Sequence, residues 1–242
     1  MMDTLNEIKA MESTDSLGAL VRRVWDWVGV DACFASSLGA EDQVMTHAIQ
    51  THCPDLPIFV LDTGRLNQET YNVMQQTMRQ YNMTYHVYYP KTKSVETMVQ
   101  THGPNHFYDS VANRKACCQV RKVEPLNRAL MGKKVWMTGM RRAQSVTRAA
   151  LDIVEQDADH GLVKINPLVA WSRDDVWQYI HSNAVPYNAL HDQGFQSIGC
   201  APCTRAVSPG DDDRSGRWWW ESPEQKECGL HVSPLPKKDQ PR

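Results

Sequence analysis

Apolar positions change their spacing repeatedly along the first two thirds of the chain. Residues 16–28 carry leucines and valines at helical spacing. Short, nearly continuous apolar runs between such segments are typical of strands buried on both faces. Strands are therefore expected at 31–36, 57–62, 84–89, 133–139 and 161–165, and helices at 16–28, 41–52, 67–81 and 172–182. This alternation predicts an α/β fold with a mostly parallel sheet and helices on both faces.

The alternation of strand and helix patterns ends after His191, where the composition of the chain changes. Residues 192–242 are rich in Gly, Pro and Asp and have little periodicity, which is typical of a mobile lid or a chain end. The segment nevertheless holds three of the seven cysteines and the tryptophan run 218–220. Because disordered segments are poor in aromatic residues, we expect it to dock and to function. We predict an α/β domain over 1–191 and an irregular segment over 192–242.

Composition excludes several classes of function. The 242 residues are 41% apolar and 22% charged, and a formal net charge of −2 gives no global basic field to attract nucleic acid. No apolar run reaches membrane-spanning length, and residues 1–11 lack the plan of a secretory signal. We therefore expect a cytoplasmic protein that binds neither nucleic acid nor a membrane. In that reducing compartment, seven cysteines indicate metal binding or thiol chemistry rather than disulfides.

The turn after the first predicted strand has the layout of a phosphate-binding loop. Ser36, Ser37 and Gly39 stand between a strand and a helix, so backbone N–H groups, hydroxyls and the helix N-terminus would all face an anion. The segment is neither a Walker loop nor a dinucleotide-binding Gly-x-Gly-x-x-Gly motif. Taken alone, it is better explained as a tight turn with a serine cap.

Two further strand ends carry polar or glycine-containing loops. Asp62, Thr63 and Gly64 follow the second predicted strand, and Gly139 and Arg141 follow a later one. In open parallel sheets, ligands bind outside the carboxyl ends of the strands. We expect these loops to share one anion site with the serine loop, although a solvated surface position is the commoner fate of any single arginine.

The cysteines form two close pairs. Cys117 and Cys118 are adjacent, and Cys200 and Cys203 form a C-x-x-C pair. Four thiolates suit zinc or an iron–sulfur cluster, and the adjacent pair departs from the usual zinc spacing. This favours a cluster over zinc, and over a thioredoxin-like redox pair at Cys200 and Cys203. If its segment is helical, Lys122 shares a face with Cys118 and can tune a metal group or bridge it to an anionic substrate; the alternative is a solvated lysine.

A single cysteine lies apart from these pairs, near the end of the chain. Cys228 is followed by glycine and lies close to His231. On a flexible tail it is a candidate nucleophile, and Arg214, Arg217 and His231 would lower its thiol pKa. Without support from other motifs, an inert cysteine is the commoner case.

Together these motifs resemble those of the assimilatory adenylyl-sulfate reductases, within the wider phosphoadenylyl-sulfate reductase family. The resemblance runs from about residue 31 to residue 231. Its motifs are SLGAED at 37–42, LDTG at 61–64, CCQVRK at 117–122, TGMRR at 138–142, the Cys200/Cys203 pair, GRWWWE at 216–221 and ECGLH at 227–231. Several independent motifs in one order make the match far more specific than any of them alone.

The resemblance implies both a fold and a cofactor. It implies an adenine nucleotide α-hydrolase-like (PP-loop) sheet, with the nucleotide bound in the domain over 1–191. It also implies that the tail over 192–242 completes the cofactor site. The implied cofactor is a [4Fe–4S] cluster on Cys117, Cys118, Cys200 and Cys203.

The resemblance also implies a reaction. Cys228 would attack the sulfur of adenylyl sulfate, release AMP and become an S-sulfocysteine. Thioredoxin, or a glutaredoxin-like dithiol, would then release sulfite, as in assimilatory sulfate reduction and cysteine biosynthesis. Arg214, Arg217 and His231 would balance the charge of the substrate when the tail closes, with Lys122 between cluster and substrate.

Three alternatives remain open at this stage. The branch specific for phosphoadenylyl sulfate typically lacks the two cysteine pairs, which favours adenylyl sulfate here, but a dual-specificity enzyme is also compatible. PP-loop thiolation enzymes sometimes bear clusters, yet they carry Ser-Gly-Gly-x-Asp-Ser where this chain has SSLGAED at 36–42. A nucleotide-binding redox sensor would leave Cys228 without a role. A homo-oligomer is compatible with the sequence, which does not specify the number of subunits.

Overall fold

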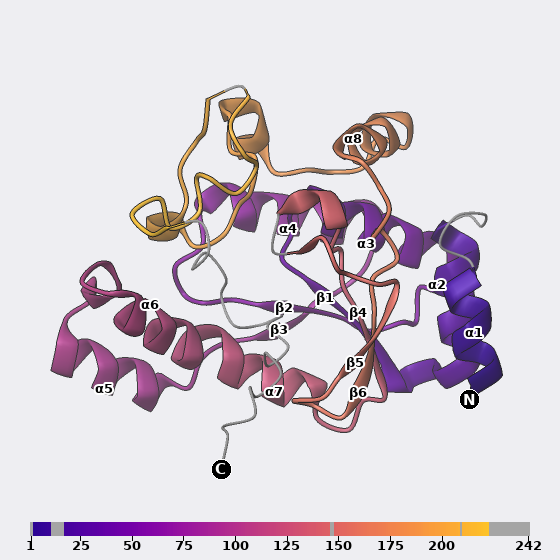
Figure 1. The fold of residues 1–242 in the computed structure, drawn as a ribbon, viewed down its shortest axis with the longest axis horizontal. Helices are drawn as coiled ribbons and strands as arrows, with labels where there is room; N and C mark the ends of the chain where they lie inside the picture. The colour runs from indigo at the N-terminus through magenta and orange to yellow at the C-terminus, as the bar shows by residue number, and fades with distance from the viewer. Residues whose placement is uncertain (1, 11–16, 146–147, 209, 223–242) are drawn as a thin grey trace, which may run out of the picture.

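The computed structural model describes residues 2–10, 17–145, 148–208 and 210–222, and it contains a six-stranded sheet (Figure 1). The strand order is β3–β2–β1–β4–β6–β5, and every neighbouring pair is parallel except β5 with β6. The strands are β1 (Ala32–Ser36), β2 (Ile58–Leu61), β3 (His86–Tyr88), β4 (Val135–Met137), β5 (Val154–Asp157) and β6 (Leu162–Ile165). The predicted fold class, a mostly parallel sheet with helices, is confirmed.

Helices connect these strands and cover both faces of the sheet. They are α1 (Met2–Ala10), α2 (Leu17–Val28), α3 (Ala40–His52), α4 (Gln68–Tyr81), α5 (Thr92–His102), α6 (Val111–Cys118), α7 (Glu124–Leu130) and α8 (Arg173–Ser182). In Figure 1, α3 and α4 lie on one side of the strands and α5, α6 and α7 on the other. Among the described residues, no helix has both the length and the apolar content needed to cross a bilayer.

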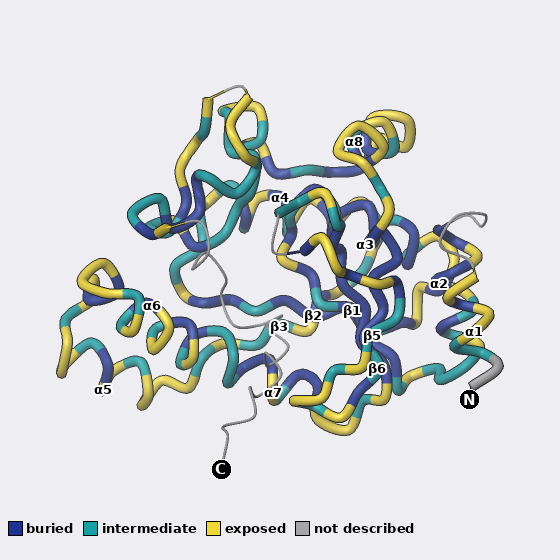
Figure 2. Tube along the Cα trace, viewed as in Figure 1, coloured by how far each residue is buried: buried dark blue, intermediate teal, exposed yellow. Residues whose placement is uncertain are grey.

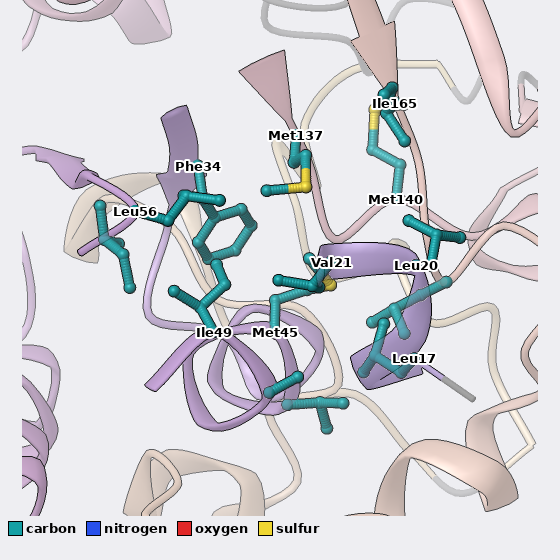
Figure 3. Close-up of a cluster of buried hydrophobic side chains, with 14 of the residues drawn as sticks. Leu17, Leu20, Val21, Phe34, Met45, Ile49, Leu56, Met137, Met140 and Ile165 are labelled. Carbon is teal, nitrogen blue, oxygen red and sulfur yellow. The ribbon is translucent and has the colours of Figure 1, made fainter. Parts of the chain in front are cut away.

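The core divides according to the two faces of the strands. Successive side chains of a strand point to opposite faces, so Phe34 joins the larger cluster with residues of α2 and α3, while Cys33 joins a smaller one. Figure 3 shows Phe34 packed near Met45 and Ile49 of α3. Strands β1, β2 and β4 and most of α3 are buried in Figure 2, and the burial of these three strands explains why their sequences are nearly continuous apolar runs.

The five strands and four helices expected from the sequence are confirmed, with boundaries that differ by at most two residues. Ser172 caps α8 as expected, and it forms a reciprocal capping box with Asp175. The sequence pattern does not predict α1, β5 or the run α5–α6–α7. Strand β5 has the sequence VEQD and is only partly buried, because it pairs with β6 alone at the edge of the sheet.

The order of the strands determines where a ligand can bind. From β1 the chain continues to β2 and β3 on one side and later returns to β4 on the other, so a topological switch point lies between β1 and β4. Residues 192–208 and 210–222 are irregular apart from short 3-10 turns and one β-bridge, and they lie on the same side of the sheet as α3 and α4 (Figure 1). Ala201 N donates to Arg65 O over 2.8 Å, so this segment docks on the loop that follows β2. The division of the chain at residue 191 stays a prediction.

Candidate active site

A cavity of about 210 Å³ lies at the switch point, at the carboxyl ends of the strands. Most of the residues predicted to bind substrate line it, and they come from five separate segments. They are Ser36, Ser37, Gly39, Thr63, Lys122, Gly139, Arg141, Arg214 and Arg217. The topology therefore brings together the strand-end loops that the sequence places far apart, while their roles in binding stay predictions.

Two of the predicted binding residues shape a loop instead of lining the cavity. Asp62 Oδ1 accepts hydrogen bonds from Gly64 N at 2.7 Å and from Tyr71 Oη at 3.1 Å. Gly64 has φ +71°, a conformation that favours glycine. These contacts fix the turn after β2, and through it the position of Thr63. Asp62 and Gly64 are not among the residues that line the cavity, and their roles in substrate binding stay predictions.

The serine loop between β1 and α3 is built by local hydrogen bonds. Leu38 has φ +63° although it is not glycine, and its N–H donates to Ser36 Oγ at 3.2 Å. Such a backbone is strained and is common at functional sites. The N-cap of α3 is Gly39, which makes no side-chain cap bond, so the alternative of a serine-capped turn is wrong for this helix.

Asp42, in the first turn of α3, holds this loop in place. Both Ser37 N and Ser37 Oγ donate to Asp42 Oδ2 at 2.6 Å. Burial raises the pKa of Asp42 to about 6, against the opposing effect of the two bonds from Ser37. Gly139 packs directly on this carboxylate, because a Cβ at that position would overlap Asp42 Oδ1. At the carboxyl end of β4, this close packing therefore leaves room only for glycine at position 139.

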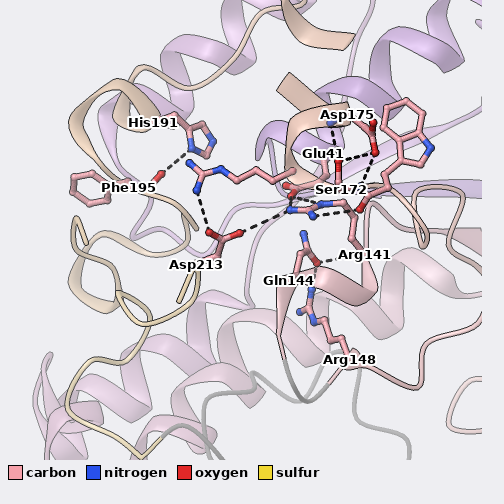
Figure 4. Close-up of polar contacts among 11 residues, drawn as sticks. Glu41, Arg141, Gln144, Arg148, Ser172, Asp175, His191, Phe195 and Asp213 are labelled. Carbon is pink, nitrogen blue, oxygen red and sulfur yellow. Dashed lines mark hydrogen bonds and ion pairs between the residues drawn. The ribbon is translucent and has the colours of Figure 1, made fainter. Parts of the chain in front are cut away.

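Arg141 lies at the cavity, but its guanidinium already has partners in the chain. Nε and Nη2 donate to Glu41 Oε1 at 2.9 and 2.8 Å, and Asp213 Oδ2 lies 4.0 Å from Nη2 (Figure 4). Burial raises the pKa of Glu41, but the charge and hydrogen bonds of Arg141 outweigh it and lower the pKa overall. Asp213 also pairs with Arg173 at 3.2 Å. Arg141 therefore ties the segment after α8 to the start of α3.

A second cavity contains all four cysteines of the two predicted pairs. Cys117, Cys118, Cys200 and Cys203 line it, from the end of α6 and from the 3-10 turn Ala201–Cys203. Cys200 Sγ lies 3.2 Å from Thr63 Oγ1. Burial raises the pKa of Cys117, and it raises the pKa of Cys203 to about 12. The free thiols of Cys117 and Cys203 are therefore protonated at neutral pH.

The four thiols suit some of the metal groups that the sequence suggests better than others. Within the described part of the chain, no three His, Cys, Asp or Glu side chains are grouped closely enough to hold one metal ion. Four thiols around one cavity, from two segments, fit a cluster in which each iron takes one thiolate better than a single tetrahedral zinc. The C-x-x-C pair lies in a short 3-10 turn rather than at the start of an α-helix, which disfavours a thioredoxin-like redox pair.

A π-helix joins the two cavities. Helix α6 ends at Cys118 and continues as η3 (Gln119–Val123), a form of helix that is rare and often found at functional sites. Arg121 Nη1 donates to Thr63 O at 2.6 Å. Lys122 lines both cavities, as do Cys200, Arg217 and Trp218. The two cavities therefore share a wall that carries two cations.

Sequence reasoning missed several residues of this site. Glu41, Asp42, Asp213 and His191 line the cavity at the switch point, and Trp218 was noted only as part of a tryptophan run. A run of acidic residues directly after the serine loop was the available signal for the first two. The predicted nucleophile Cys228 and the predicted substrate-binding residue His231 lie outside the described residues.

Comparisons with known proteins agree with this geometry. The family model described as phosphoadenosine phosphosulfate reductase domain matches residues 31–206. An adenosine 5'-phosphosulfate reductase of Allochromatium vinosum is 54% identical over 198 residues, covering 82% of this chain and 77% of that one. A crystal structure of phosphoadenylyl-sulfate (PAPS) reductase from Candida auris, a phosphate complex, aligns with TM-score 0.69 and 30% identity over 83% of this chain and 96% of that one.

A more distant structure shows the fold alone. Yeast FAD synthetase in complex with FAD aligns with TM-score 0.54 at 13% identity, over 84% of this chain and 74% of that one. The sheet therefore has the PP-loop-like arrangement that the sequence predicts.

Proposed function

Because this chain belongs to the phosphoadenosine phosphosulfate reductase family, we propose that it reduces adenylyl sulfate to sulfite and AMP in assimilatory sulfate reduction. The observation that carries the proposal is the cavity at the switch point, lined by the serine loop and by Lys122, Arg214 and Arg217. Its neighbour, the four-cysteine cavity, distinguishes the chain from a simple nucleotide-binding protein.

The phosphosulfate group is the part of the substrate that these residues suit. It is a doubly charged anion, and burial of such a group requires cations or hydrogen-bond donors nearby. Ser37 N and Leu38 N are already bonded within the loop over 36–39, so positive charge for the anion comes from Lys122, Arg214 and Arg217 at the cavity. Glu41 and Asp42 already hold Arg141 and Ser37 in place, so the carboxylates at this cavity are part of its scaffold.

The proposed chemistry uses Cys228 as the nucleophile. Its thiolate attacks the sulfur of adenylyl sulfate, an S–S bond forms, and the bond between sulfur and the phosphate oxygen breaks. The electron pair of that bond leaves with AMP, so the cysteine carries a sulfonate as S-sulfocysteine. A thiol of thioredoxin, or of a similar dithiol, then attacks Cys228 Sγ and releases sulfite. Its second thiol restores the Cys228 thiol and leaves the dithiol partner oxidised by two electrons.

We further propose that a [4Fe–4S] cluster is held by the two cysteine pairs. The thiols of Cys117, Cys118, Cys200 and Cys203 line one cavity, and four thiolates are the usual ligands of such a cluster. When bound, it would supply fixed charge and order beside the substrate, since the dithiol provides both electrons. Lys122 and Arg217 lie on the wall between this cavity and the substrate cavity, where they would balance charge on both sides.

Adenylyl sulfate is preferred over its 3'-phosphorylated form in this proposal. The relative at 54% identity is named for adenosine 5'-phosphosulfate, whereas the solved structure at 30% identity is named for PAPS. Competition between the two substrates tests this preference. A higher kcat/KM for phosphoadenylyl sulfate would assign the chain to the other branch.

The decisive experiment is intact-mass measurement of anaerobically purified protein mixed with adenylyl sulfate without a reductant. We expect the mass of one added sulfite group on the wild type, none on Cys228→Ser, and removal of the group by reduced thioredoxin. A protein that binds nucleotide but gains no mass would refute the reductase. In that case a thiolation enzyme or a redox sensor becomes the better explanation.

A further inference from the structure

Trp218 lies between the two cavities, where its side chain is buried and its backbone has an unfavourable conformation. Its side chain is 1% exposed and its φ is +40°, a conformation that costs free energy for any residue except glycine. Its indole Nε1 has no hydrogen-bond partner among the described residues. The ring therefore needs some other interaction to hold it at the shared wall.

Two guanidinium groups provide that interaction. Cζ of Arg114 lies 4.6 Å from the centroid of the Trp218 ring, and Cζ of Arg217 lies 4.8 Å from it. Cation–π contacts of this kind are strongest when the groups are buried, as both arginines are. Arg114 comes from α6, three residues before Cys117, whereas Arg217 comes from the C-terminal segment. The ring thus connects the cysteine-bearing helix with a residue of the substrate cavity.

Arg114 also fixes the turn that contains Trp218. Its Nε and Nη2 donate to Glu221 Oε1 and Oε2 at 2.9 and 2.6 Å, and both side chains are at most 2% exposed. Glu221 N in turn donates to Trp218 O at 2.8 Å. A bidentate, buried pair of this kind has a specific geometry. It holds residues 218–221 against α6, directly before residues 223–242, which include Cys228.

Arg217 has little freedom once this turn is fixed. Its Nη1 donates to Ile198 O at 3.2 Å, and its guanidinium lies over Gly199, where a Cβ would be 2.5 Å from Arg217 Cζ. The guanidinium of Arg217 therefore occupies space at the cavity that any side chain at position 199 would fill. A small shift of the 218–221 turn would move this guanidinium relative to a bound anion.

We propose that Arg114 is a positioning residue, which through Glu221 and Trp218 sets the place of Arg217 at the substrate cavity. The proposal rests on the proposed function, because its readout is the binding of adenylyl sulfate. Arg114 lines the cysteine cavity and not the substrate cavity, so it acts on the substrate only through these neighbours.

The test is a double-mutant cycle with an apolar replacement of the ion pair. Exchange of a buried ion pair for apolar groups often preserves stability, so Arg114→Met/Glu221→Leu is the main variant. We expect it to fold, to raise KM for adenylyl sulfate about tenfold, the effect of one lost charge-assisted hydrogen bond, and to show a matching rise in the Kd of adenylyl sulfate in a Cys228→Ser background. Arg217→Ala should weaken binding in the wild type and add little in this variant.

Lys164→Met/Glu155→Leu is the matched control, since it likewise replaces both partners of an ion pair, here between β6 and the edge strand β5. It should leave the Kd of adenylyl sulfate unchanged. If the main variant does not fold, Arg114→Lys replaces it, because it keeps the charge but not the bidentate pair, and it should still raise KM. Unchanged KM, or fully additive effects of Arg217→Ala, would overturn the proposal. Wild-type protein that makes no sulfite would instead refute the proposed function.

Discussion

A single methyl group at Gly139 tests the packing of the serine loop. Gly139→Ala places a Cβ where Asp42 Oδ1 now lies, 3.3 Å from Asp42 Cγ and 3.2 Å from Glu41 Cβ. The carboxylate cannot move aside without loss, because Ser37 N and Ser37 Oγ both donate to it at 2.6 Å. Hydrogen bonds to charged groups contribute ~1.5–3 kcal/mol each, and overpacking of a dense site costs ~1–3 kcal/mol.

We therefore expect Gly139→Ala to lower the free energy of unfolding by ~3 kcal/mol, which for a chain of this size lowers Tm by about 6–12 °C. Urea and thermal unfolding at pH 7.5 measure this loss, and the Kd of adenylyl sulfate should rise with it. Gly39→Ala is the matched control for stability, since a Cβ there meets only Ser37 Oγ at an ordinary 3.4 Å.

Removal of the Asp42 carboxylate tests the cause of this destabilisation. In an Asp42→Ala background the added Cβ no longer overlaps a carboxylate oxygen, so the further loss of unfolding free energy caused by Gly139→Ala should fall below ~1 kcal/mol. The reasoning is refuted if Gly139→Ala is as stable as Gly39→Ala, or if its cost is the same with and without the Asp42 carboxylate.

Three further outcomes are expected. Since the folded-state pKa of Asp42 is raised to about 6 from 3.8, its contribution to stability is complete below pH 3.8 and is lost as pH rises through 6. Asp42→Asn should therefore gain stability relative to the wild type between pH 4 and pH 7, by up to ~3 kcal/mol in urea unfolding. If the difference in unfolding free energy between the two proteins does not change with pH, the pKa of Asp42 is not raised. Cys117→Ser and Cys200→Ser should lose bound iron in anaerobic metal analysis, whereas Cys53→Ala should retain it, and equal iron in all three would exclude the two pairs as ligands. Ser172→Ala removes the cap of α8 and should cost ~1 kcal/mol in thermal unfolding without a change in KM.

The parts of the site that sequence predicts are those that topology brings together. A parallel sheet places the ends of its strands at one edge, so loops after 31–36, 57–62 and 133–139 were expected to meet, and they do. The cysteine pairs were recognisable because thiols are rare and their spacing has few uses. Neither inference requires knowledge of which side chains touch.

The parts that sequence does not predict depend on partners far apart in the chain. Arg141 pairs with Glu41 across 100 positions, and Arg114 pairs with Glu221 across 107. No local sequence pattern identifies such partners. An arginine at a cavity is therefore predicted to bind a ligand even when its guanidinium already pairs with a carboxylate of the same chain. Helices α5 and α6 were missed for a different reason, because α5 buries only Met98 and α6 buries only Arg114 and Cys118, so neither has an apolar face that the sequence makes visible.

Charge explains why the two cavities share a wall of this composition. Under the proposed function, four thiolates lie on one side of the wall and a doubly charged substrate on the other, so the two groups repel each other across a medium of low dielectric constant. Lys122 and Arg217 line both cavities and attract both anions at once. Cations on this wall therefore do more than bind substrate. They lower the cost of placing an anionic reactant beside a cysteine-bound anionic group, and their position depends on a π-helix on one side and a cation–π stack on the other.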